Sequence, residues 1–259
     1  MSVKKFPVEY AYLYLLLVRF PLVLVHIYLA VQIIRISNLS VFYDEVEIIK
    51  NINLEISKNE IVGFVGKNGS GKSTILSTII AINNFSGTIK VKNIDINKNL
   101  NFKKYIGYIP ENVEIFPGFT GEQYIKYIAS FRGIRNFKER EDFLVNILGL
   151  KSVYKCRVSK YSKGSIQKLS IISALIHKPE ILIMDEPFDG LDVESQKIFI
   201  KLLKDFYEDG GTILFSCHSQ KYINELCTRI IYLNNGKIVN DICKSNNNLD
   251  CKIKENTRG

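Results

Sequence analysis

The sequence is poor in the residues that cross-link small secreted folds or bind zinc. It has 3 histidines and 5 cysteines among 259 residues, and no two cysteines form a Cys-x-x-Cys pair. An odd cysteine count fits no closed disulfide framework, so a reducing, cytosolic compartment is the simplest inference. The scarcity of both ligand types also argues against a zinc site.

Basic residues are plentiful, but they are not massed in one run. The net charge of +9 is compatible with a nucleic acid partner, an anionic membrane surface or simply a solvated basic surface, and charge alone does not choose among them. A hydrophobic content of 46% supports a packed core and excludes global disorder. The length suits one large domain, or one domain with a helical insert.

The longest apolar run, residues 10–34, lacks the small-residue cleavage site of a secretory signal. It is long enough to span a bilayer, but Arg19, Pro21 and His26 interrupt it. A central arginine costs about 3 kcal/mol of insertion free energy, which makes insertion marginal. Three hypotheses stay open for residues 1–31: a membrane-associated anchor, a segment packed on a partner, or a translated stretch ahead of the true start.

From residue 32 onward, short β-rich runs alternate with helical patterns. Strands are predicted around residues 33–43, 48–56, 60–66, 86–91, 180–186 and 211–216, with a final hairpin around Asn235 and Gly236. Amphipathic helices are predicted after Gly71, over 121–134, 137–150, 193–208 and 220–227, and directly after Tyr161. This order predicts an α/β fold with a mainly parallel sheet.

A phosphate loop follows the predicted central strand. The stretch GKNGSGKST consists of Gly66, Lys67, Asn68, Gly69, Ser70, Gly71, Lys72, Ser73 and Thr74, and it fits G-x-x-x-x-G-K-[ST]. The glycines let backbone N–H groups curl around a phosphate, while Lys72 reaches the β- and γ-phosphate oxygens. The Ser73 hydroxyl is placed for Mg²⁺.

A second anchor is the run ILIMDEP, a buried strand that ends in Asp185. The Asp185 carboxylate is predicted to serve a metal ion, and Glu186 is predicted to position and polarise an attacking water. A strand-end helix cap is the alternative for the Asp-Glu-Pro sequence. The nearby phosphate loop favours the functional interpretation.

With these motifs in order, the sequence from about Ile33 to Asn240 resembles the nucleotide-binding domain of ATP-binding cassette (ABC) transporters. GFVGKNGSGKST is similar to the family's Walker A motif, YSKGSIQKL to its signature motif and ILIMDEP to its Walker B motif. The stretch from Gly190 to Asp192 resembles the D-loop, and His218 resembles the switch histidine. His177 is interpreted differently, as a helix-end residue favoured by the negative end of the helix dipole.

The resemblance implies further roles in binding ATP. Tyr43 stands where such cassettes place an adenine-stacking aromatic residue, although Phe42 beside it offers a second ring. Asp192 of the D-loop is grouped with the nucleotide-binding residues. Glu111 stands where the family usually has glutamine in the loop that links Mg²⁺ and water to the membrane partner, and a glutamate can still ligate a hard cation.

The signature motif departs from the family's usual Leu-Ser-Gly-Gly-Gln, because Tyr161 to Ser165 read Tyr-Ser-Lys-Gly-Ser. The two residues expected to touch phosphate, Ser162 and Gly164, are kept. In the family, two cassettes face head to tail, and each signature helix closes on the γ-phosphate held by the other chain. The resemblance therefore implies that a second cassette chain, most simply a copy of this one, completes the site.

The expected fold is a P-loop NTPase (RecA-like) core with a mainly parallel sheet, an N-terminal antiparallel β portion and a helical insert at about 112–165. The cassette domain is expected over 32–240, between an apolar extension at 1–31 and a polar tail at 241–259. The expected function is a Mg²⁺-dependent ATPase subunit at the cytoplasmic face of the membrane, driving export through a separate permease. Alternatives are an importer subunit or a soluble cassette outside transport, and no nucleic acid partner is expected.

Overall fold

The structure is a computed structural model that describes residues 32–244. The apolar extension 1–31, with its three hypotheses, and residues 245–259 lie outside the described part of the chain. Between residues 32 and 244, no helix is both long and apolar enough to cross a membrane.

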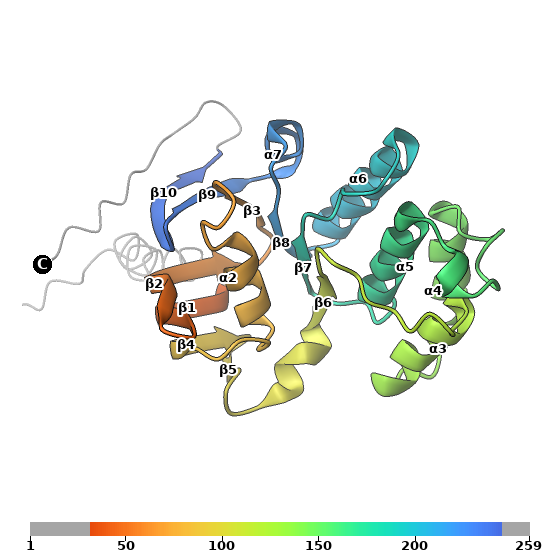
Figure 1. Cartoon of the computed structure of the whole chain (residues 1–259), viewed down its shortest axis with the longest axis horizontal. Coiled ribbons are helices and arrows are strands. Elements are labelled where there is room, and N and C mark those ends of the chain that lie inside the picture. The colour runs from red at the N-terminus through yellow and green to blue at the C-terminus, as the bar shows by residue number, and fades with distance from the viewer. Residues whose placement is uncertain (1–31, 245–259) are drawn as a thin grey trace, which may run out of the picture.

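Two sheets form the framework of the fold (Figure 1). The four-stranded antiparallel sheet has the order β2-β1-β4-β5, with β1 Gln32–Tyr43, β2 Val46–Ser57, β4 Ser86–Val91 and β5 Ile94–Asp95. The six-stranded sheet has the order β10-β9-β3-β8-β7-β6, with β3 Ile61–Val65, β6 Ile106–Ile109, β7 Ile181–Asp185, β8 Thr212–Ser216, β9 Arg229–Asn234 and β10 Lys237–Cys243. All its neighbours are parallel except β10 on β9, so the expected fold class is confirmed.

The central strands are buried on both faces, as their continuous apolar sequence predicts. In β7, Ile181 and Ile183 pack into a core shared with the antiparallel sheet and the helix α2 (Lys72–Ile79), whereas Leu182 and Met184 pack into a second core. That second core lies against the helices α5 (Lys163–Leu175), α6 (Val193–Glu208) and α7 (Gln220–Leu226). The period of two therefore divides each strand between two hydrophobic cores.

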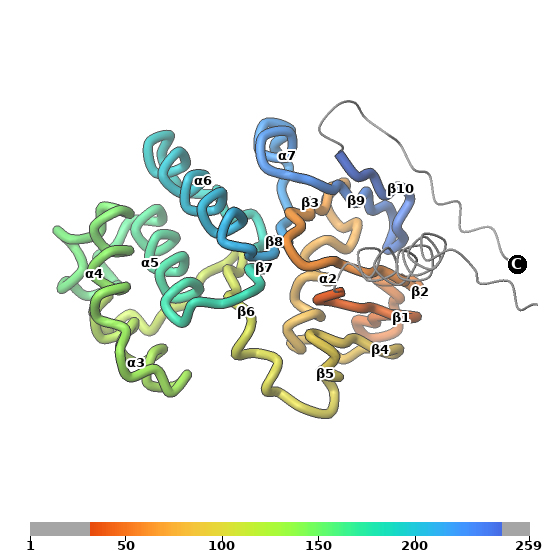
Figure 2. Tube along the Cα trace, turned by 180° about the vertical axis from the view of Figure 1, so that it is seen from behind, coloured from red at the N-terminus to blue at the C-terminus, as the bar shows by residue number. Residues whose placement is uncertain are grey.

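A group of helices lies at the end of the molecule away from the antiparallel sheet (Figures 1 and 2). It contains α3 (Gly121–Phe131), α4 (Lys138–Ile147), the 3-10 turn η2 (Val158–Lys160) and the start of α5. A capping box between Thr120 and Gln123 fixes the start of α3. The two ends of the group are joined, because the Val158 N–H donates to the Phe119 carbonyl at 2.7 Å.

Two local features differ from the sequence-based expectation. The polar stretch after β5, for which the sequence predicts no helix, contains a 3-10 helix, η1 (Leu100–Tyr105), in which Phe102 is fully buried. Strand β10 continues to Cys243, beyond the expected end of the cassette at residue 240. The extension is held by Asp241, whose carboxylate accepts two 2.7 Å hydrogen bonds from Arg229 on β9. The polar composition of the chain from Asp241 onward therefore did not indicate that its first residues belong to a paired strand.

The contact between β6 and α5 is unusually close, and it leads to a stability prediction. A Cβ on Gly107 in β6 would lie 2.3 Å from the Ala174 carbonyl oxygen on α5. Gly107→Ala is therefore expected to lower the free energy of unfolding by about 1–3 kcal/mol, the usual cost of overpacking. Chemical denaturation measures the change.

Gly118→Ala is the matched control, because a Cβ there meets nothing within 4 Å. It should unfold like the parent chain. Equal unfolding of both variants and the parent would contradict the close packing of β6 on α5.

Candidate active site

The candidate site lies at the carboxyl ends of the central parallel strands. The phosphate loop follows β3, Asp185 ends β7, and His218 comes two residues after β8. Because β3, β8 and β7 are parallel neighbours, their carboxyl ends lie along one edge of the sheet. Three of the predicted motifs therefore meet at one place.

The phosphate loop is shaped by close contacts at its glycines. A Cβ on Gly66 would lie 2.4 Å from the Leu233 carbonyl oxygen, and one on Gly71 would lie 2.5 Å from the Ile49 side chain. Gly71 also has a φ of 105° at the start of α2, a conformation that favours glycine. The loop geometry thus depends on these two residues.

Lys72 and Ser70 give the loop its polar interior. The Lys72 side chain is buried, and its Nζ donates to the carbonyls of Gly66 at 3.0 Å and Lys67 at 3.2 Å. The Ser70 hydroxyl is buried without a hydrogen-bond partner in the described structure. A buried hydroxyl and an ammonium group in a loop at a helix N-terminus form a site that suits phosphate.

The β9–β10 hairpin supports this loop from behind. The Gly236 N–H donates to the Ser70 carbonyl at 3.1 Å, and the Gly236 carbonyl accepts from the Lys50 N–H at 2.9 Å. A Cβ on Gly236 would lie 2.0 Å from the Ile48 carbonyl oxygen. The turn that the Asn-Gly pair predicts is therefore also a structural support of the phosphate loop.

Ser216, the last residue of β8, links the two carboxylates of the site. Its hydroxyl donates to the buried carboxylate of Asp185 and accepts from the Glu186 N–H at 3.0 Å. Glu186 has a φ of 44°, a strained value for a non-glycine residue. The two neighbouring carboxylates, Asp185 and Glu186, therefore have different surroundings. Asp185 is not a helix cap, since no helix begins at it.

Glu186 and His218 are in direct contact. Their Oε1 and Nε2 atoms are 3.1 Å apart, and 12% of the Glu186 side chain is exposed against 52% for His218. Burial raises the pKa of the Glu186 carboxyl above its usual value, while the charges of His218 and Lys72 act in the opposite direction. A carboxylate with a raised pKa is a better proton acceptor, which suits a general base.

The structure distinguishes Tyr43 from Phe42, although both rings are about half exposed. The Tyr43 hydroxyl donates to Asn83 Oδ1 at 3.3 Å. The Asn83 amide in turn donates to the hydroxyls of Ser77 at 2.8 Å and Thr78 at 3.0 Å on α2. Tyr43 is thus connected to the helix of the phosphate loop, and no such link is present for Phe42 among the described residues.

Glu111 lies in the exposed loop after β6, next to the strand that carries Asp185. Burial raises the pKa of Tyr108 in β6 to about 12, with further contributions from the charges of Asp185 and Glu111. Glu111 is therefore near the carboxylates of the site. No side-chain hydrogen bond fixes it within the described residues.

The signature motif begins α5, where the Ser162 hydroxyl accepts from the Ser165 N–H at 3.2 Å. A Cβ on Gly164 would lie 2.7 Å from the Gly190 carbonyl oxygen, so the helix start packs on the D-loop. Farther along, the Gln167 amide donates to the Pro187 carbonyl at 2.9 Å. In Figures 1 and 2, α5 and α2 lie on opposite sides of the central strands, so the chain does not bring its signature to its own phosphate loop.

Asp192 and His177 have structural surroundings that the sequence did not show. The Asp192 carboxylate accepts from the Ser195 N–H at 2.8 Å and caps α6, and this hydrogen bond lowers its pKa. His177 does follow α5, but burial lowers its pKa to about 4, with Arg132 acting in the same direction. His177 is therefore neutral near pH 7. The prediction of a favourable interaction between a charged His177 and the helix dipole is wrong.

Sequence reasoning missed Asn83 and gave Ser216 no role. Ser216 has a weak sequence signal, as a hydroxyl residue that ends a buried apolar strand next to the strand of the paired carboxylates. Asn83 has no signal of this kind, because only the folded chain brings it beneath Tyr43.

ATP and Mg²⁺ fit this donor set. The glycine-lined loop and the buried Ser70 and Lys72 groups suit a phosphate chain. Within residues 32–244, no group of three or more His, Cys, Asp and Glu side chains could hold a metal ion. The Asp185 carboxylate, at the same edge of the sheet as the phosphate loop, suits Mg²⁺, which binds through one or two carboxylates together with substrate phosphates. Ser73, Asp185 and Glu111 are the candidate ligands.

Comparison with known proteins agrees with the site. The family model described as ABC transporter matches residues 49–189. An uncharacterized ABC transporter ATP-binding protein of Bacillus subtilis, YdbJ, is 34% identical over 215 residues, covering 81% of this chain and 69% of YdbJ. The linearmycin resistance ATP-binding protein LnrL of the same organism is 30% identical over 210 residues, covering 80% of this chain and 68% of LnrL.

A solved structure has a similar fold. It is an ATP-binding cassette in a dimeric, post-hydrolysis state bound to ADP and Pi. It is 26% identical to this chain with a TM-score of 0.72, and the match covers 80% of this chain and 97% of that one. The chain therefore belongs to the ABC transporter family as an ATP-binding protein, and its fold carries the ATPase activity of that family.

Proposed function

We propose that this chain is the Mg²⁺-dependent ATPase subunit of an exporter and works as a head-to-tail homodimer beneath a separate membrane permease. The observation that carries the proposal is the separation of the two anion-binding half-sites. The phosphate loop begins α2 and the signature begins α5, on opposite sides of the central strands (Figure 1). A second copy is the simplest source of the missing half.

We assign each residue a role from its position in the site and from the family resemblance. Lys72 and the loop N–H groups hold the β- and γ-phosphates, and Tyr43 stacks on adenine. Ser73, Asp185 and Glu111 hold Mg²⁺, which when bound supplies positive charge that stabilises the phosphoryl transition state. Glu186 accepts the proton of the attacking water, and His218 at 3.1 Å orients that carboxylate. Ser162 and Gly164 face the γ-phosphate of the partner chain, with Asp192 beside them.

An exposed aromatic patch supports the permease partner. Phe116, Phe119, Tyr127 and Phe131 form a continuous series of ring contacts with centroids 5.6, 6.0 and 6.5 Å apart. Phe116 is 65% exposed and Phe131 is 81% exposed, which is unusual for side chains of this size. The patch starts in the same loop as Glu111, so a partner seated there could act on the ATPase site.

The name of one relative supports export. LnrL is named for linearmycin resistance, and removing a toxic compound from the cell is a direct way to resist it. The same direction is proposed for this chain, at the cytoplasmic face of the membrane.

Glu186→Gln should bind ATP and lose turnover by at least about a hundredfold, because the amide cannot accept the proton of water. It should also accumulate as an ATP-stabilised dimer, which size-exclusion chromatography measures beside a phosphate-release assay. Glu114→Gln, in an exposed loop, is the matched control and should keep its turnover. Near-native hydrolysis by Glu186→Gln would show that the base lies elsewhere.

The shared site predicts complementation between two inactive variants. Lys72→Ala loses the phosphate loop but keeps the signature, whereas Ser162→Arg keeps the loop and blocks the signature. Their heterodimer contains one intact site, so a mixture should regain ATPase activity that neither variant has alone.

Ser159→Arg adds the same charge three residues before the signature serine and should leave activity unchanged. If Ser162→Arg weakens ATP binding to the monomer as much as Lys72→Ala does, the signature serves its own chain. The dimer proposal then fails.

The aromatic patch predicts a selective loss of membrane association. The double variant Phe116→Ser/Phe131→Ser should keep its ATPase activity in solution and leave the membrane fraction of cells that express the permease. Phe143→Ser, an exposed phenylalanine on α4 outside the patch, is the control. Unchanged membrane association of the double variant would refute the patch as the permease contact.

A further inference from the structure

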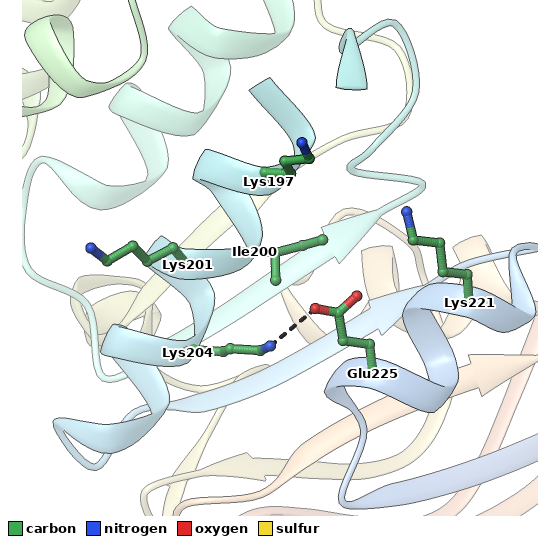
Figure 3. Close-up of a pocket in the computed structure, with 6 residues that line it drawn as sticks. All are labelled: Lys197, Ile200, Lys201, Lys204, Lys221 and Glu225. Atoms are coloured by element: carbon green, nitrogen blue, oxygen red, sulfur yellow. Dashed lines mark hydrogen bonds and ion pairs between the residues drawn. The ribbon is translucent and has the colours of Figure 1, made fainter. Parts of the chain in front are cut away.

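A basic groove lies between α6 and α7, outside the ATPase site described above. Its lining consists of Lys197, Ile200, Lys201 and Lys204 from α6 and Lys221 and Glu225 from α7, around a cavity of about 350 Å³ (Figure 3). Four lysines and one glutamate from two helices therefore line the groove, although the Lys201 ammonium extends to the side of α6 that faces away from α7 (Figure 3).

The lysines of α6 are placed on one face by their spacing. Lys197, Lys201 and Lys204 follow each other at intervals of four and three residues, which aligns them on a helix. Like charges at these spacings destabilise a helix. Local helix stability therefore does not explain this arrangement, and an anion between the ammonium groups would remove the repulsion.

Most of this charge is not neutralised by the protein. Lys204 pairs with Glu225 at 3.0 Å, and Lys197 approaches the highly exposed Glu194 at 3.9 Å. In the described part of the chain, no ion pair involves Lys201 or Lys221, and Lys221 lies 5.4 Å from the Tyr222 ring centroid. The groove thus keeps a net positive charge.

The walls of the groove are held in position before any ligand arrives. The Tyr222 hydroxyl of α7 donates to Gln196 Oε1 of α6 at 2.7 Å, and the Tyr222 ring stacks on Phe188 with centroids 4.0 Å apart. The Lys204–Glu225 pair crosses between the same two helices (Figure 3). Because these side chains are already ordered, binding a ligand costs little conformational entropy in the protein.

We propose that this groove binds a small soluble polyanion that carries at least two phosphate groups. Ammonium groups bind phosphate as point charges, and lysines on both walls of the groove match a ligand with several negative groups better than a ligand with one. The volume lies in the range of small-molecule sites. The groove is concave and Ile200 lies largely buried on its α6 wall, which favours a compact ligand over a flat membrane surface.

The test uses tripolyphosphate as the probe on the full chain, with the nucleotide site saturated by ADP and about 0.15 M salt to screen weak surface attraction. Lysine acylation followed by mass spectrometry reads each site separately. Lys197 and Lys221 should be protected several-fold, whereas the exposed Lys90 and Lys126, outside the groove, should react as before. Equal protection of all four lysines, or of none, overturns the proposal.

The double variant Lys197→Gln/Lys221→Gln should bind tripolyphosphate at least about tenfold more weakly in equilibrium dialysis, since it removes two charge-assisted contacts. Lys90→Gln/Lys126→Gln has the same net charge and should bind like the parent. Equal affinity of the two double variants places the anion elsewhere and overturns the proposal.

Vesicles that contain phosphatidylglycerol form the second arm, because lipid headgroups share the phosphate chemistry. If the natural ligand is soluble, tripolyphosphate should protect the groove lysines and vesicles should not. Protection by vesicles alone would assign the groove to a membrane surface and overturn the small-molecule proposal.

Discussion

The geometry of the candidate active site depends on the two hydrogen bonds of the Ser216 hydroxyl. This hydroxyl joins the ends of β8 and β7 by donating to Asp185 and accepting from the Glu186 backbone. The chain must turn sharply at that point, with a positive φ at Glu186, and this turn directs the second carboxylate toward His218 instead of leaving it beside the first. One small polar residue thereby gives two consecutive acidic residues different contacts.

Direct contacts between distant segments also organise the rest of the cassette. Parallel strands bring the phosphate loop and both carboxylates to one edge, and close packing at glycines joins the pieces that must act together. Gly164 brings the start of α5 against the D-loop, and Gln167 connects α5 to the segment after β7. The segment that we propose faces a partner chain is thus linked by direct contacts to the end of β7.

Much of this fold could be predicted from sequence, because its elements are encoded locally. The phosphate loop has a fixed spacing, the buried strands are unbroken apolar runs, and Asn235-Gly236 specifies its own turn. What escaped prediction depends on residues far apart in the chain. Asn83 meets Tyr43, Ser216 meets Asp185, and Arg229 holds Asp241 in a strand only after the sheets assemble. His177 looked like a cation at a helix end, but burial makes it neutral.

The contact between Gly236 and Ser70 also bears on how the protein is made. The ribosome releases the phosphate loop before the β9–β10 turn, so the loop emerges long before the segment that supports it. Strand β3 likewise lacks its neighbours β8 and β9 until late. A nascent chain therefore carries the complete nucleotide signature without a finished binding site. Competence to bind ATP thus depends on synthesis of the β9–β10 turn, which lies far along the chain from the phosphate loop itself.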